Sequence, residues 1–179
     1  MIKFLARRAA NAMERKYNYD STYLREVADV SRGGALRLSL LSLLSGYDKG
    51  APVDLWAGAA VASTREGDCG PCLQLVIDMA LEKGANPGCL RAALQQDFDA
   101  ARLTGLGFRF AQAAIADGSE LDSLREEIIG QYGEQAVISL SITAATSRSW
   151  PVVKRGLGHG RACQAVEIDN TKIELITAG

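Results

Sequence analysis

Histidine is nearly absent from this chain, which has only His159 among its 179 residues. A three-histidine metal site therefore cannot form within one chain. The sequence also lacks an excess of basic residues, because it has 20 Lys and Arg residues and 21 Asp and Glu residues. Proteins that bind nucleic acids through a basic stripe have a different charge balance. We expect no nucleic-acid partner, no resident metal and no cofactor.

Long hydrophobic runs are missing as well. The most apolar stretch, residues 35–44, is interrupted by Arg37 and is far shorter than the ~20 residues that span a bilayer. Charged side chains also interrupt residues 1–17, where a signal peptide would need an uninterrupted apolar core. We therefore expect a cytoplasmic protein with no membrane partner.

Breaker residues divide the chain into short segments that mostly have helical composition. Residues 35–44 and 134–148 are apolar on nearly every side, which indicates buried helices, partly covered by another subunit. Gly105 and Gly107 predict an interruption or tightening in one helix. In residues 165–177 apolar and polar side chains partly alternate, which predicts a short hairpin or an extended tail lying on a partner. The predicted helices cover 3–16, 22–30, 35–44, 53–65, 69–83, 86–95, 100–116, 121–131, 134–148 and 152–157.

The fold class expected from this pattern is all-α, in one domain of residues 1–179. We divide it into a helical N-terminal extension at 1–50, a core at 53–158 and an extended tail at 164–179.

Cysteine is scarce, and only two of the four cysteines form a motif, Cys69-Gly70-Pro71-Cys72. In a reducing compartment a close cysteine pair is more often catalytic or metal-binding than structural. A spacing of three places both sulfurs on one face of the first turn of a helix, with Asp68 as the expected cap. The free N–H groups there favour an anion, so Cys69 is the expected nucleophile and Cys72 the resolving thiol.

Thioredoxin carries the same four-residue motif, but a thioredoxin-like domain needs a strand before the motif. Here residues 55–62 are Ala-rich and helix-like. The motif is therefore expected to have helices on both sides, which excludes the thioredoxin fold.

The stretch Cys69–Gly84, followed by a short helix from Asn86 to Leu94, resembles the AhpD-like/carboxymuconolactone decarboxylase superfamily. The similarity covers roughly 53–158. It implies an all-α bundle that assembles into dimers, trimers or hexamers. It also implies two cysteines that reduce peroxides or exchange disulfides, with a thiol protein or small thiol as reductant.

Two residues of that family's proton relay are missing from this chain. Val76 stands where the redox members carry a His, four residues after the second Cys. Ala57 stands where they carry a Glu, about twelve residues before the first. Glu66 could replace them as a base if the helix breaks at Gly67. The alternative is that Glu66 is a solvated loop residue.

Other features allow a binding or a packing interpretation. His159 and Cys163 could complete a four-ligand zinc set with the motif, or His159 could be an exposed or partner-contact residue. Trp56 and Trp150 could wall an apolar pocket beside the dithiol, or simply pack in the core. Cys89 follows Pro87-Gly88 at a helix start and fits a half-buried packing residue. The C-terminal region is locally basic. Its four basic residues could form a solvated face, or they could contact an anion or another subunit: Arg148, Lys154, Arg155 and Arg161.

Three functions remain open at this point. The first is a thiol–disulfide or peroxide-reducing enzyme that uses Cys69 and Cys72, with Glu66 as a candidate base. The second is a helical oligomer without turnover. The third, a decarboxylase-type reaction, has no support in this sequence beyond the resemblance.

Overall fold

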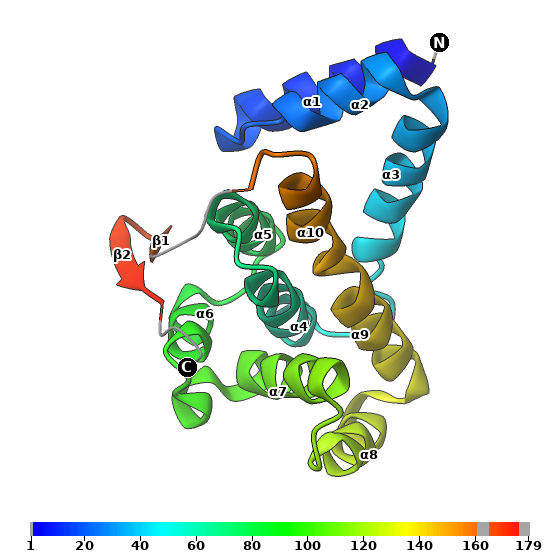
Figure 1. Cartoon of the computed structure of the whole chain (residues 1–179). Helices are drawn as coiled ribbons and strands as arrows, with labels where there is room; N and C mark the ends of the chain where they lie inside the picture. The colour runs from blue at the N-terminus through cyan, green and yellow to red at the C-terminus, as the bar shows by residue number, and fades with distance from the viewer. Residues whose placement is uncertain (1, 161–164, 176–179) are drawn as a thin grey trace.

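The computed structural model describes residues 2–160 and 165–175, and most of them are helical (Figure 1). The all-α prediction is confirmed at this level, with one small two-stranded sheet added. In chain order the elements are α1 (Ile2–Tyr17), α2 (Thr22–Val30), α3 (Arg32–Ser45), α4 (Val53–Glu66), α5 (Gly70–Glu82), α6 (Pro87–Leu94), α7 (Phe98–Ala116), α8 (Leu121–Tyr132), α9 (Glu134–Ser147), α10 (Ser149–Gly156), β1 (Ala165–Ile168) and β2 (Thr171–Glu174). Among the described residues, none of these helices combines the length and the apolar character needed to cross a membrane.

Helix α4 forms the centre of the fold, and every residue from Leu55 to Thr64 is buried. It packs against α5, α7 and α9. The contact with α7 is closest at two glycines. A Cβ added to Gly107 would lie 2.0 Å from the Leu55 carbonyl oxygen, and one added to Gly58 would lie 2.0 Å from that of Thr104. The two backbones therefore touch directly, which only glycine allows at these positions.

The irregularity in α7 lies elsewhere than predicted. Arg102, with φ 50° and ψ −124°, leaves helical geometry, whereas Gly105 and Gly107 lie in the regular part of the helix. The sequence-based expectation was wrong because these glycines serve packing rather than bending: Gly107 contacts α4, and Gly105 approaches the Phe98 carbonyl within the same helix.

The first three helices form an arm, which we call the N-terminal arm (residues 2–45). Helices α1 and α2 run side by side, and α3 returns toward the core and packs against α9 (Figure 1). The prediction that residues 35–44 form a buried helix was wrong for this chain, because Ala35 is the only buried residue of α3. The leucines of its outer face have no covering element in the described chain and are exposed: Leu36, Leu40, Leu43 and Leu44.

The hairpin predicted within 165–177 is confirmed, with β1 and β2 antiparallel. Asp169 and Asn170 connect them with φ of 50° and 58°, the backbone conformation of a tight two-residue hairpin turn. The hairpin packs on α5 of its own chain. The side-chain amide of Gln74 donates to the Glu167 carbonyl at 2.9 Å, and its oxygen accepts the Glu167 N–H at 2.8 Å.

Candidate functional site

The two motif cysteines lie at the amino end of α5, directly after the turn that ends α4. Cys69 occupies the N-cap position and Cys72 lies in the first turn. Both side chains are buried, and both are thiols rather than a disulfide. Helices precede and follow the motif, as predicted. The expected cap was wrong, since Cys69 itself is the N-cap and Asp68 adopts a left-handed conformation with φ 45° in the preceding turn.

The sulfurs interact with each other. The pKa of Cys72 is raised, first by a side-chain hydrogen bond with Cys69 and second by burial. The Cys72 thiol therefore keeps its proton and can donate it toward Cys69, the sulfur at the helix N-cap. Partial positive charge from the first-turn N–H groups favours an anion at that same end.

Two tyrosines from the N-terminal arm cover the dithiol. The Tyr19 hydroxyl lies 3.6 Å from the Cys72 sulfur and donates to the Tyr23 hydroxyl at 3.2 Å. Burial raises the pKa of both phenols. They are therefore neutral hydroxyls at ordinary pH, able to donate a hydrogen bond without adding charge.

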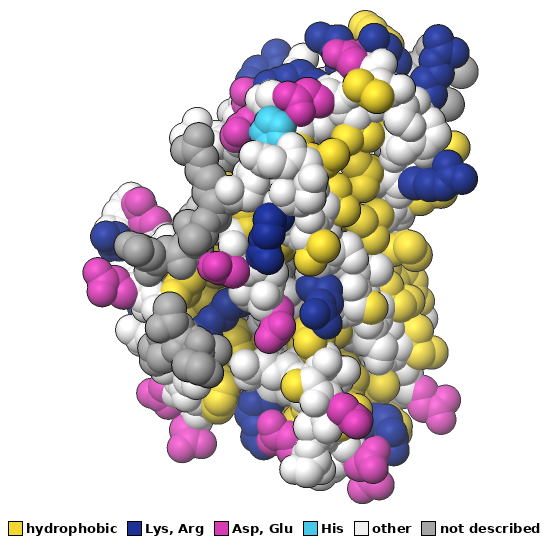
Figure 2. All heavy atoms as spheres, viewed as in Figure 1, with side chains coloured by type: hydrophobic (Ala, Val, Ile, Leu, Met, Phe, Trp, Pro, Cys, Tyr) yellow, Lys and Arg dark blue, Asp and Glu magenta, His cyan; other side chains and the backbone are white. Residues whose placement is uncertain are grey.

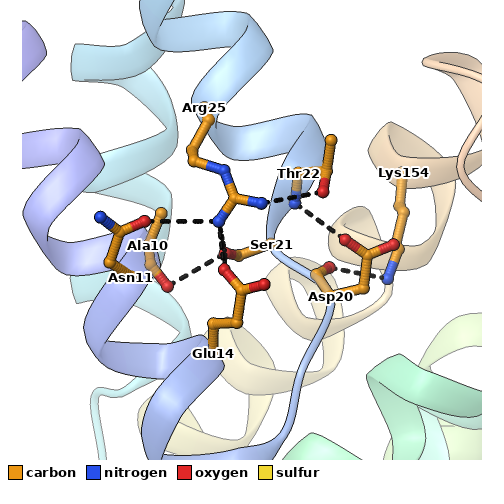
Figure 3. A network of polar contacts seen from close by, with 8 residues as sticks. All are labelled: Ala10, Asn11, Glu14, Asp20, Ser21, Thr22, Arg25 and Lys154. Carbon is orange, nitrogen blue, oxygen red and sulfur yellow. Dashed lines mark hydrogen bonds and ion pairs between the residues drawn. The ribbon is translucent and has the colours of Figure 1, made fainter.

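A lysine completes the cluster. Lys154, in α10, is only 1% exposed, and its Nζ donates to the Asp20 carbonyl at 3.2 Å (Figure 3). The same nitrogen lies 4.3 Å from the ring centroid of Tyr19 and 5.5 Å from that of Tyr23. Its charge lowers the pKa of Cys72, although less than the other causes raise it. We call Cys69, Cys72, Tyr19, Tyr23 and Lys154 the dithiol cluster.

Polar contacts hold the arm and α10 around this cluster. Glu14 of α1 pairs with Arg25 of α2, which also contacts Ser21 (Figure 3). After the end of α10, His159 Nε2 lies 2.8 Å from the carboxylate of Glu26 in α2. Arg155 donates to the carbonyl of Gly67, just before the motif. The cluster is thus assembled from three separate parts of the chain: residues 19–23, the CxxC turn and α10.

An apolar cavity of about 290 Å³ lies between the N-terminal arm and helices α4 and α5. Cys72, Tyr19 and Tyr23 belong to its wall, so the cavity adjoins the dithiol. Trp56 and Trp150 also line it, as the pocket interpretation predicted. Trp56 is at the same time a buried core residue, so the packing interpretation holds for it as well.

The remaining candidate residues are not part of the dithiol cluster as defined above, and they give no support to a metal site. Glu66 is exposed at the end of α4, so its role as a base stays a prediction. Cys89 is half-buried near the start of α6. Cys163 lies outside the described residues. Within the described part of the chain, no group of three or more potential metal-ligating side chains occurs.

The sequence-based reasoning missed Tyr19, Tyr23 and Lys154. Lys154 was grouped with a basic surface, because lysine is rarely buried. Its spacing of three from Pro151, which is also buried, was the only local signal for an inward face. The tyrosines lie about 50 residues from the motif, and nothing in the sequence indicates that the N-terminal arm folds over it.

Comparison of the chain with protein-family models, with curated proteins and with solved structures finds no match. The site is therefore interpreted from its own geometry.

Proposed function

We propose that this protein is a thiol–disulfide or peroxide-reducing enzyme that uses Cys69 and Cys72, on an AhpD-like fold. The observation that carries the proposal is the pair of hydrogen-bonded thiols at the amino end of α5, beside a buried lysine. A helix amino terminus and a nearby cation favour a thiolate, and the protonated Cys72 thiol can donate a hydrogen bond to it.

The proposed cycle balances as follows. The Cys69 thiolate attacks one peroxide oxygen, the O–O bond breaks, and the other oxygen leaves as water or an alcohol after taking up a proton. Cys69 is then a sulfenic acid. Cys72 attacks its sulfur and releases water, and the Cys69–Cys72 disulfide forms. Two thiols from a reductant protein or a small thiol reopen it, and they are oxidised to a disulfide.

Tyr19 and Lys154 are the polar side chains that flank the dithiol in this proposal, where the family's relay residues are missing. The Tyr19 hydroxyl lies 3.6 Å from the Cys72 sulfur, so this buried side chain fixes the position of that thiol. Lys154 supplies positive charge in a buried setting, where charges interact more strongly than in water. Both act as positioning residues, and neither is asked to abstract a proton.

We expect Lys154→Met to shift the pH dependence of thiol reactivity upward by about one unit. Removing a buried cation makes the thiolate less favourable, and one unit corresponds to about 1.4 kcal/mol. The measurement is the rate of iodoacetamide modification of Cys69 between pH 5 and 10, followed by peptide mass. Lys172→Met, an identical change on the exposed hairpin, serves as control. Overlapping pH profiles for Lys154→Met and the unmodified chain would remove Lys154 from the proposal.

The assay that tests the proposed function is disulfide trapping with peroxide consumption. One equivalent of hydrogen peroxide or an organic hydroperoxide should yield an intact mass lower by two hydrogens, and a thiol reductant should restore it. A helical protein without turnover is the second candidate, favoured by Val76 and Ala57 at the relay positions. It would be the correct one if the thiols stayed reduced. A decarboxylase-type reaction ranks last because no contact of the cluster supports it.

We also propose that the chain forms a homo-oligomer. The outer face of α3 carries Leu36, Leu40, Leu43 and Leu44, which are 45%, 51%, 73% and 50% exposed. Their spacing places them on one side of the helix. Figure 2 shows hydrophobic side chains along this edge of the molecule. The α3 helix of a second copy would cover this stripe in a twofold-symmetric interface, in which both subunits contribute the same leucines.

The double substitution Leu40→Glu with Leu43→Glu should weaken self-association at least a hundredfold, because unpaired carboxylates are costly to bury in an apolar interface. Sedimentation velocity over a concentration series measures this. The control is Ile129→Glu with Val152→Glu, two exposed apolar residues on α8 and α10. A chain that sediments as a monomer before any substitution would contradict the proposal.

A further inference from the structure

The cavity beside Cys72 has the composition of a binding site for an apolar molecule. Aliphatic and aromatic side chains dominate its wall, among them Met13, Leu38, Val76 and Met79. Apolar cavities of this kind exclude water and take up apolar ligands. Methionines on two sides, from α1 and α5, adapt their shape easily to an occupant.

Several polar groups in the wall are already engaged by the protein, whereas the buried indole N–H of Trp56 has no hydrogen-bond partner among the described residues. The hydroxyls of Ser39 and Thr64 donate to carbonyls of their own helices, at 2.9 and 2.8 Å. Ser45 donates to the Leu41 carbonyl at 3.0 Å and accepts the indole N–H of Trp150 at 3.2 Å. The wall therefore offers few hydrogen bonds to a ligand, the Trp56 N–H among them. A strongly polar ligand would lose more hydrogen bonds with water than it gained in the cavity.

The one lysine in the wall is also paired. Lys83 forms an ion pair with Asp48, and its Nζ lies 4.4 Å from the ring centroid of Trp56. A charged ligand would have to compete with that carboxylate. The geometry points to an uncharged molecule with an alkyl chain.

We propose that this cavity binds the alkyl chain of a small uncharged molecule, with one end against Cys72 and Tyr19. Ser42, an exposed residue of α3, belongs to the wall. Binding requires only the shape and polarity of the cavity. It is therefore independent of the proposed redox function, although a bound ligand would lie next to the dithiol.

Both tryptophans of the chain line the cavity, so the whole tryptophan fluorescence reports on it. Bromooctanol should quench this fluorescence saturably, because bromine quenches indoles at contact. Unbrominated alkanols should displace it, with the dissociation constant falling about fourfold for each added methylene, the equivalent of ~0.8 kcal/mol. Ser42→Phe and Val76→Phe should each weaken binding at least tenfold by filling the cavity. Ser141→Phe, at an exposed position of α9 outside the wall, should leave binding unchanged.

Quenching that rises linearly without saturation, or that is equal in all three phenylalanine variants, would overturn the proposal. If circular dichroism shows that either cavity variant is unfolded, a second experiment on the unmodified chain tests the proposal: protection of Cys72 from iodoacetamide by octanol. Octanol should then slow iodoacetamide modification of Cys72 but not of Cys89, which lies outside the cavity; equal rates would reject the site. The Cys69→Ser chain should still bind bromooctanol saturably, because binding does not require the redox thiol. Failure of the redox proposal can thus be distinguished from failure of the binding proposal.

Discussion

Cys69→Ser should abolish both the intramolecular disulfide and peroxide consumption, with a loss of at least a thousandfold in rate. A serine hydroxyl at the N-cap stays protonated at neutral pH and has no oxidised form that Cys72 could attack. The helix should remain intact, because serine is a favoured N-cap residue. The readouts are the intact mass after one equivalent of peroxide and the rate of peroxide loss.

Cys72→Ser separates the two thiols. In the proposed cycle this variant still reacts once with peroxide but stops at the Cys69 sulfenic acid, which a dimedone adduct detects. Cys89→Ser, which alters a cysteine outside the dithiol cluster, should retain full turnover. If Cys69→Ser kept its activity, the assignment of the nucleophile would be wrong. If the unmodified chain formed no disulfide at all, the non-catalytic function would replace the proposal.

Gly107→Ala should destabilise the fold by more than about 3 kcal/mol, above the usual range for overpacking. The added methyl would lie 2.0 Å from the Leu55 carbonyl oxygen and 3.3 Å from the Ala59 nitrogen. Both are backbone atoms, so no side chain can rotate to make room and α4 must move away from α7. Urea unfolding followed by circular dichroism measures the loss.

Gly130→Ala is the matched control for this prediction. Gly130 also lies inside a helix, α8, but an added Cβ would have no neighbour within 4 Å. Alanine there should stabilise the protein by about 0.5–1 kcal/mol, because glycine loses more backbone freedom on folding. Equal stability changes at the two positions would mean that α4 and α7 do not touch at Gly107.

Local sequence signals predicted the elements near the candidate site well. Residues 22–30 form the helix that was expected there, and the helices around the motif agree to within a few residues. These segments carry strong local information in their helix formers, prolines and glycines. Where tertiary contacts decide, the same approach was less accurate. Residues 35–44 are apolar enough for a core helix, yet their outer face is exposed because no element of the described part of the chain covers it.

The sequence by itself determined that this is a helical protein with two cysteines at the start of one helix, because helix periodicity and a CxxC spacing are local properties. Only the tertiary structure decided what surrounds those sulfurs. Tyr19 and Lys154 are 135 residues apart, and they come together because side chains of the N-terminal arm and of α10 pack against the dithiol. Which distant side chains converge on one point depends on how whole helices pack, and no local pattern encodes that.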